Sequence, residues 1–262
     1  MDRKVALTSK NSNVDSQGCE KKIKSGPNVN VVESKTARKN HLKITTFIME
    51  AGQRLKLPPG TCASACVLYH RLYKQYFQRE YDPNLVATAA LYLASKTEES
   101  PCKLRDVINV SYRLLHRDKP PLEVGSLYWE LHDSVANCEL MILRALQFQV
   151  SFDSPHKYLL HYLNSLEDWL DKECTITSSL SQLSWSILQD SFHTTLCLEY
   201  SPAVIAIAMI YFSLTCLGID VPSQGARHSW WKALCPRSTE DEIQAIILHM
   251  IDFYSLENVV SD

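Results

Sequence analysis

The sequence predicts an all-α fold, with two tandem domains of five helices each. Apolar residues recur at helical spacing from Leu42 onward, and no segment shows the alternation or the Asn-Gly turn of a β-hairpin. In addition, the segment YDPNLVATAALYL at 81–93 recurs as YSPAVIAIAMIYF at 200–212. Similarity over that distance indicates that a domain of roughly one hundred residues has been duplicated. The 262 residues are 45% hydrophobic, which is enough for two such cores.

Five helices are predicted in the first domain, and the repeated segment is the third of them. Its proline stands in the first turn, where a missing N–H costs nothing. Because this helix is apolar on nearly every side, we expect it at the centre of a bundle with the other helices around it. The five are expected at Leu42–Leu57, Thr61–Phe77, 83–99, Lys103–Leu115 and Tyr128–Gln147.

The second domain begins at Ser154 and Pro155, which are a favourable N-cap and first helical residue. Ser238 and Thr239, followed by three acids, give its last helix a start that resembles a capping box. Its helices are expected at 155–170, 178–199, 202–217, in a short piece near Trp230–Leu234, and at 239–254. The predicted boundaries are a tail at 1–40, a first domain at 41–150 and a second at 151–262.

Charge is distributed unevenly along the chain. Residues 1–43 hold ten lysines and arginines against four acids, whereas the remainder holds seventeen against twenty-five. A basic start without apolar periodicity predicts a disordered tail, and an acidic folded part argues against direct binding of nucleic acid. The cluster Lys21, Lys22 and Lys24 resembles a weak nuclear-import signal, so we expect the protein in the nucleus, the cytoplasm or both.

No motif for enzymatic chemistry stands out. Glycine is scarce, at 7 residues where average usage would give roughly eighteen, and the phosphate-binding patterns G-x-G-x-x-G and G-x-x-x-x-G-K-[ST] are absent. Cys62, Cys66 and His70 stand at i, i+4 and i+8 of one predicted helix, too far apart to converge on one ion, so buried thiols are the favoured interpretation. We therefore expect no enzyme activity, no metal and no cofactor.

The segment from Tyr200 to Ile219 has twenty residues without a charge, which meets the length criterion for a membrane span. It also contains Pro202 and Ser213 and lacks a basic flank. Because it holds the second copy of the repeat, we interpret it as a buried core helix and expect no membrane association. The chain shows no signal peptide, and its nine scattered cysteines fit a reduced intracellular protein.

Two charges inside the first domain need an explanation. Lys96 lies in the last turn of the predicted third helix, and the second copy has Thr215 there, so the core of the repeat does not require a lysine. Glu139 stands in the apolar stripe of the fifth helix, which is apolar nearly all round and is expected to be buried. A buried carboxylate must be paired, and Lys96 is the expected partner. The pair either stabilises the fold alone or takes part in binding, and the pattern leaves both open.

The stretches LYLASKTEE and CELMILRALQF resemble the third and fifth helices of a cyclin box, and the resemblance to the cyclins extends over roughly residues 40–255. It implies a regulatory subunit that forms a heterodimer with a cyclin-dependent kinase and activates it by positioning the mobile αC helix of the kinase. Lys96 and Glu139 would then form the charged centre of the binding surface, with Glu98 only solvated nearby. The residues expected around the centre are Leu93, Thr97, Glu99, Leu143 and Phe148.

Three further segments refine the resemblance. HLKITTFIMEAGQRL, RDVINVSYR and FQVSFDSPHKYLLHYL are most similar to the cyclin-Q branch of the family, which implies cyclin-dependent kinase 10 as the partner. One alternative stays open, because tandem cyclin-like folds also occur in general transcription factors of the TFIIB type, which bind promoter DNA and polymerase. Those proteins usually carry a zinc ribbon with paired C-x-x-C motifs, whereas the tail here has only Cys19.

Overall fold

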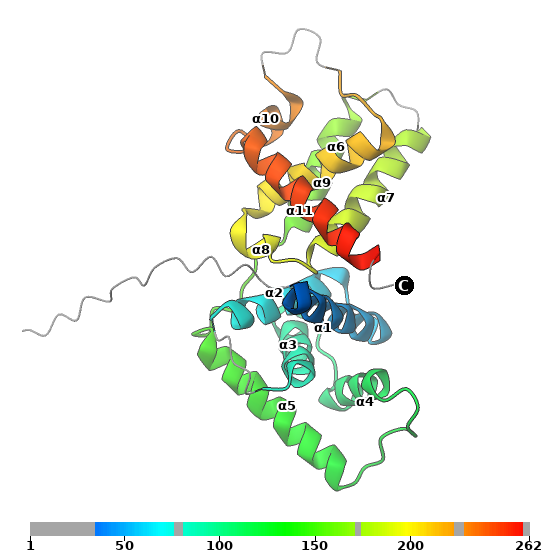
Figure 1. The fold of residues 1–262 in the computed structure, drawn as a ribbon, viewed down its shortest axis with the longest axis vertical. Coiled ribbons are helices and arrows are strands. Elements are labelled where there is room, and N and C mark those ends of the chain that lie inside the picture. Colours follow the sequence, from blue (N-terminus) through cyan, green and yellow to red (C-terminus); the bar gives the residue numbers. More distant parts are fainter. Residues whose placement is uncertain (1–34, 76–80, 171–173, 223–227, 259–262) are drawn as a thin grey trace, which may run out of the picture. The chain divides into compact units, whose positions relative to one another are not determined.

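The computed structural model describes residues 35–75, 81–170, 174–222 and 228–258, and within these ranges the chain forms helices and no strand (Figure 1). The predicted all-α class is therefore confirmed. The first group of helices is α1 (Lys35–Arg54), α2 (Pro59–Gln75), α3 (Pro83–Thr97), α4 (Leu104–Leu115) and α5 (Ser126–Ala145). The second is α6 (Pro155–Glu167), α7 (Cys174–Ser191), α8 (Leu196–Glu199), α9 (Pro202–Leu217), α10 (Trp230–Leu234) and α11 (Glu240–Asn258).

The two copies of the repeat are α3 and α9, and each is the central helix of its group. Helix α3 packs against α1, α2, α4 and α5, while α9 packs against α6, α7, α8 and α11. Both start in the same way, with a side-chain cap followed by proline: Asp82 accepts a hydrogen bond from the Asn84 N–H at 3.0 Å, and Ser201 accepts one from the Val204 N–H at 3.4 Å. The repeated sequence therefore produces a repeated helix start and a repeated buried centre.

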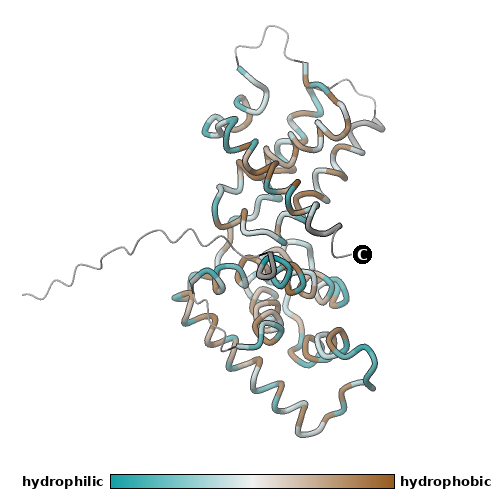
Figure 2. The backbone as a smooth tube through the Cα atoms, viewed as in Figure 1, coloured by the Kyte–Doolittle hydropathy of each residue, from teal (hydrophilic) through white to brown (hydrophobic). Residues whose placement is uncertain are grey.

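Helix α9 is a core helix, as predicted, with the run from Val204 to Ile210 buried. Among the described residues, no helix has both the length and the hydropathy that a bilayer crossing requires. Figure 2 shows hydrophilic residues interspersed among hydrophobic ones along α5, the long helix at the lower left.

Most helix ends differ from the predicted ones by one to four residues, and two differences are larger. Helix α1 begins at Lys35, before the expected start at Leu42, and the predicted helix 178–199 is wrong because α7 ends at Ser191 and α8 starts at Leu196. At the break, the Thr194 hydroxyl donates to the Ser191 carbonyl at 2.6 Å and accepts from the Leu196 N–H at 3.4 Å. The Phe192 carbonyl accepts instead from His70 Nε2 at 3.0 Å, so a tertiary contact replaces the next helical hydrogen bond.

Polar contacts also join the two groups of helices. His193 Nδ1 lies 2.8 Å from the Thr45 hydroxyl of α1, and Gln189 Nε2 lies 3.4 Å from the sulfur of Met49. On α2, Arg71 donates to two carbonyls of the connection between α5 and α6. The break between α7 and α8 is thus anchored on α1 and α2.

Candidate functional site

Lys96 and Glu139 form the predicted pair. Helices α3 and α5 are packed neighbours, and Lys96 Nζ lies 2.6 Å from Glu139 Oε1. The lysine side chain is 43% exposed and the glutamate 11%, so the carboxylate is buried while the ammonium reaches solvent. Burial opposes the charge on Lys96, but the hydrogen bond to Glu139 and the attraction between the two charges outweigh it and raise the pKa of the amine.

Two features hold Lys96 in place at the end of α3. Its Nζ lies 4.0 Å from the centroid of the Tyr92 ring, a cation–π geometry. Its ammonium has three N–H donors, and Glu139 takes one of them. A partly exposed, pre-oriented ammonium with donors left over is suited to hydrogen-bond acceptors on another molecule.

The turns that follow α3 and α5 both contain residues in the left-handed region without being glycine. Glu99 has φ 51°, while Gln147 and Phe148 have φ 51° and 61°. Hydrogen bonds impose these conformations: the Ser100 N–H donates to the Ser95 carbonyl at 2.9 Å, and the Phe148 N–H donates to the Leu143 carbonyl at 2.8 Å. Such conformations cost of order 1–3 kcal/mol each and collect at functional sites. Lys56, with φ 57°, ends α1 in the same way.

The five residues expected around the Lys96–Glu139 pair differ in how far they are exposed to solvent. Phe148 is 68% exposed, which is unusual for an aromatic side chain, and Glu99 is exposed as well. Leu143 and Thr97 are half-buried, and the Thr97 hydroxyl donates to the Ala94 carbonyl at 3.2 Å. Leu93 differs from them: it is 4% exposed, because it faces the core of the bundle, so it supports the surface from below and offers a partner little area.

Two expectations near the pair are corrected by the structure. Helix α5 is not buried all round, because α3 and α4 cover only one of its sides and leave Trp129 and Leu140 exposed on the other. Glu98 is exposed but not merely solvated, since it accepts a hydrogen bond from the Ser64 hydroxyl of α2 at 2.6 Å. Glu98 therefore ties the end of α3 to α2.

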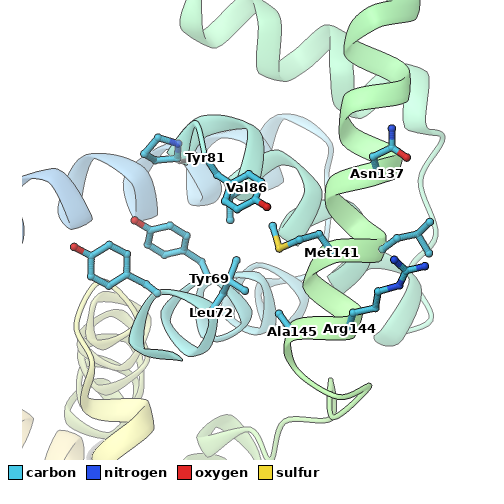
Figure 3. Close-up of a pocket in the computed structure, with 11 residues that line it drawn as sticks. Tyr69, Leu72, Tyr81, Val86, Asn137, Met141, Arg144 and Ala145 are labelled. Carbon is cyan, nitrogen blue, oxygen red and sulfur yellow. The ribbon is translucent and has the colours of Figure 1, made fainter. Parts of the chain in front are cut away.

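A groove that the sequence did not predict lies between α5 and α2, at the start of α3 (Figure 3). Its volume is about 690 Å³, and helices α2 and α5 and the start of α3 line it. Leu140 and Arg144, four residues apart on α5, lie roughly 100° and 140° around the helix from Glu139. The groove is therefore separate from the Lys96–Glu139 surface. Its lining residues include Tyr69, Leu72, Tyr81, Val86, Asn137 and Met141.

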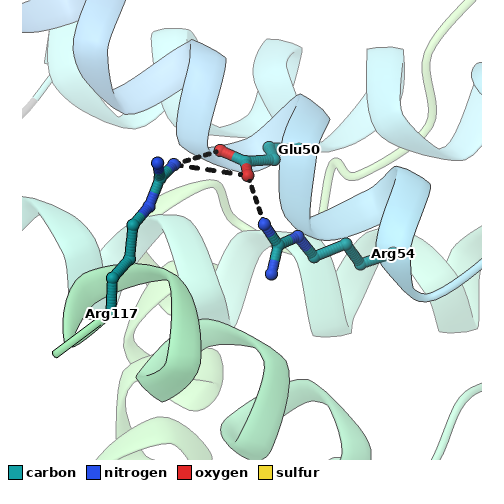
Figure 4. Close-up of polar contacts among 3 residues, drawn as sticks. All are labelled: Glu50, Arg54 and Arg117. Atoms are coloured by element: carbon teal, nitrogen blue, oxygen red, sulfur yellow. Dashed lines mark hydrogen bonds and ion pairs between the residues drawn. The ribbon is translucent and has the colours of Figure 1, made fainter. Parts of the chain in front are cut away.

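A second polar cluster joins α1 to the segment that follows α4. Glu50 receives a hydrogen bond from Arg54 at 2.7 Å, and Arg117 Nη2 lies 3.3 Å from its other oxygen (Figure 4). All three side chains are partly open to solvent, where ion pairs contribute at most about 1 kcal/mol. This cluster is explained by local packing.

The cysteines and histidine considered as metal ligands lie in the core. Burial raises the pKa of the Cys62 thiol to about 11 and raises that of Cys66 as well, so both are protonated and inert at neutral pH. His70 makes the hydrogen bond to Phe192 described above. Over the described residues, no group of three or more potential ligands is close enough to hold a metal ion.

Comparison with solved structures identifies the fold. The chain matches one in the crystal structure of the yeast RNA Pol II CTD kinase CTDK-1 complex, with a TM-score of 0.68 and 20% identity over 84% of this chain and 66% of that one. It also matches a chain of the CAK complex from Chaetomium thermophilum, with a TM-score of 0.61 and 15% identity over 84% and 63%. The described helices therefore adopt the fold of these chains.

The sequence comparison identifies the family. Residues 16–151, just over half of the chain, match the cyclin N-terminal domain, and the chain therefore belongs to the cyclin family. Cyclin-L1 of Gallus gallus is 35% identical over 217 residues, which cover 81% of this chain and 39% of that protein. Cyclin-T1-4 of Arabidopsis thaliana is 29% identical over 220 residues, or 82% and 38%. The chain spans about two fifths of the length of these relatives.

Proposed function

We propose that the chain is the regulatory subunit of a heterodimer and that it binds and activates a cyclin-dependent kinase. The observation that carries this proposal is the Lys96–Glu139 pair, a half-exposed ammonium on a buried carboxylate. Phe148, in the turn that follows α5, adds an exposed aromatic ring. A pair that served the core alone would not hold its ammonium at the surface with N–H donors left over. Membership of the cyclin family and the kinase complexes among the similar structures support the same function.

The mechanism follows from what a kinase lacks when it is alone. Catalysis needs the β3 lysine paired with a glutamate of αC, and αC is mobile. A surface that binds αC only in the productive orientation shifts the kinase toward its active state by differential affinity. Phe148 and Leu143 supply apolar contact area, while Lys96 and Glu139 fix the orientation through hydrogen bonds to the kinase. In this proposal the chain acts by binding alone, and the groups that perform the phosphoryl transfer belong to the kinase.

The finer assignment is the cyclin-Q branch, with cyclin-dependent kinase 10 as the partner. It rests on the three segments quoted from α1, α4 and the start of α6. In this proposal the first cyclin box, 41–150, binds the kinase, and the second box occupies 151–262. The basic tail at 1–40 precedes them, and its residues from Lys35 onward already belong to α1. Residence in the nucleus, the cytoplasm or both belongs to the same proposal.

Capture of kinases by the purified chain tests this function. A panel of cyclin-dependent kinases that includes cyclin-dependent kinase 10 is incubated with wild type and with K96A/E139A. We expect wild type to capture and activate a kinase and K96A/E139A to lose capture, because the kinase groups that the two charges contact lose their partners. Truncating one partner of a charge pair that is buried in an interface costs about 2–5 kcal/mol. D153A/K157A is the matched control, since it removes an exposed ion pair of the second group of helices.

Circular dichroism establishes that each variant is folded. Equal capture by wild type and K96A/E139A would return the pair to a structural role and contradict the proposed surface. If wild type captures no kinase, the TFIIB-like alternative is favoured, and binding to DNA and polymerase is measured next. K96A and E139A are also measured singly: a double variant no weaker than either single one indicates that the two residues act as one unit.

A further inference from the structure

The chain contains three Ser-Pro pairs, and helix starts explain two of them. Ser154 and Ser201 are N-caps, each followed by proline at the first helical position. Their hydroxyls accept hydrogen bonds from the N–H groups of His156 and Val204, both at 3.4 Å. The third pair, Ser100-Pro101, starts no helix, because α4 begins at Leu104 with Lys103 as its N-cap. Helix capping therefore leaves this pair unexplained.

The segment around Ser100 is accessible. Ser100 is half-buried, Pro101 and Lys103 are exposed, and Lys103 has an extended backbone with φ −73° and ψ 135°. The Ser100 hydroxyl makes a hydrogen bond to the Thr61 hydroxyl at 2.8 Å. A hydroxyl held by one neighbour at the surface is free to react after a small local movement.

Ser154 is a natural comparison within the same chain, because it too is followed by proline and, three residues on, by lysine. Its hydroxyl, however, lies 2.8 Å from His156 Nδ1 and caps α6. The lysine at that position, Lys157, is paired with Asp153 at 2.5 Å. The same four-residue pattern thus caps a helix at Ser154, where Pro155 is buried, whereas at Ser100 it caps no helix and Pro101 is exposed.

We propose that Ser100 is a phosphorylation site for a proline-directed serine kinase. Such kinases accept a serine followed by proline, which has no N–H to satisfy. The exposed Lys103, three residues after Ser100, offers a cation that such a kinase can recognise with an acidic group. Ser100 Oγ attacks the γ-phosphorus of ATP, and the bond from that phosphorus to the bridging oxygen of ADP breaks. The hydroxyl proton passes to the catalytic aspartate of the kinase, and ADP leaves.

The consequence of the modification rests on the proposed function. A phosphoserine carries a charge of about −1.5 to −2 at neutral pH. At Ser100 this charge follows the C-terminal end of α3, where the helix dipole is already negative, and it stands next to Glu98 and Glu99. It removes the hydrogen bond to Thr61 and adds negative charge four residues from Lys96, at the edge of the proposed kinase-binding surface. Phosphorylation at Ser100 therefore weakens docking of the partner kinase, by about tenfold.

The site itself is tested on the full chain without its partner. A purified cyclin-dependent kinase, already saturated with its own cyclin, is supplied with ATP, and phosphopeptides are quantified by mass spectrometry. We expect phosphate on Ser100 at a level at least tenfold above that on Ser154 or Ser201, and a severalfold lower rate in Lys103→Ala. No phosphate on Ser100, or as much on Ser154, would overturn the proposal.

The effect on docking is measured with the kinase captured by the unmodified chain. The phosphorylated chain is expected to bind that kinase about tenfold more weakly, while Ser100→Ala treated in the same way keeps full binding. Equal binding by the phosphorylated and unmodified chains would overturn the proposed consequence. If the unmodified chain captures no kinase, the proposed function fails, whereas phosphopeptide mapping still decides whether Ser100 is modified.

Discussion

At the scale of single residues, Glu99 shows that the surface beside Lys96 and Glu139 is not optimised for stability alone. Its φ of 51° places a side chain where glycine is usual, at a cost of about 1–2 kcal/mol relative to a right-handed conformation. We expect Glu99→Gly to raise the free energy of unfolding by about 1 kcal/mol, after allowance for the extra chain entropy of glycine. Urea denaturation measures this change.

Lys56 provides the control for that substitution, because it has φ 57° in the turn after α1. Lys56→Gly is expected to raise stability by a similar amount and to leave kinase capture unchanged. Glu99→Gly, in contrast, is expected to weaken capture, since it removes an exposed carboxylate from the rim of the proposed surface. A loss of stability in Glu99→Gly would show that the carboxylate contributes to the fold.

At the scale of elements, the close approach of α1 and α2 depends on Gly52. A Cβ at this buried position would lie 2.3 Å from Cys62 Sγ and 3.7 Å from Leu91 Cδ1. Gly52→Ala is therefore expected to lower the free energy of unfolding by about 1–3 kcal/mol, because the helices must separate or the thiol must move. The double variant G52A/C62A removes the clashing sulfur and should return close to wild-type stability.

Gly60→Ala is the matched control for Gly52→Ala, and the stability of both variants is measured by chemical denaturation. Gly60 lies in the first turn of α2, and an added Cβ would have no heavy atom within 4 Å. This variant should be neutral or slightly stabilising. If C62A fails to rescue G52A, the packing of α1 against α2 is limited by the backbone and not by the thiol.

At the scale of the whole molecule, sequence patterns predicted the helices that are determined by residues close together in the chain. The repeated Y-x-P segment specifies a cap, a proline and an apolar helix, so α3 and α9 were predictable, and a glutamate in an apolar stripe indicated the contact with Lys96. The break after α7 was not predictable, because its partner His70 is 122 residues away. The left-handed turn at Phe148 carries no glycine to indicate it, and periodicity could not tell that one side of α5 stays uncovered.

That break belongs to a junction between the two groups of helices at which two histidines, the buried His70 and the partly buried His193, make hydrogen bonds. Burial lowers the pKa of His70 to about 4, although its hydrogen bond to the Phe192 carbonyl opposes the shift. Burial likewise lowers the pKa of His193 to about 4. Both imidazoles are therefore neutral in the folded protein at pH 5–7, where each makes a hydrogen bond across the junction.

Acid is accordingly expected to destabilise the protein through this junction. The unfolded chain binds protons at both histidines below about pH 6.5, whereas the folded chain does so only near pH 4, so stability is present above pH 6.5 and is lost as the pH falls. The loss approaches about 1.4 kcal/mol per pH unit for each histidine. Urea denaturation at pH 7, 6 and 5 measures the slope. His70→Gln should reduce this slope. His161→Gln, at an exposed position on α6, is the control variant. An equal slope in wild type and His70→Gln would show that other groups cause the acid sensitivity.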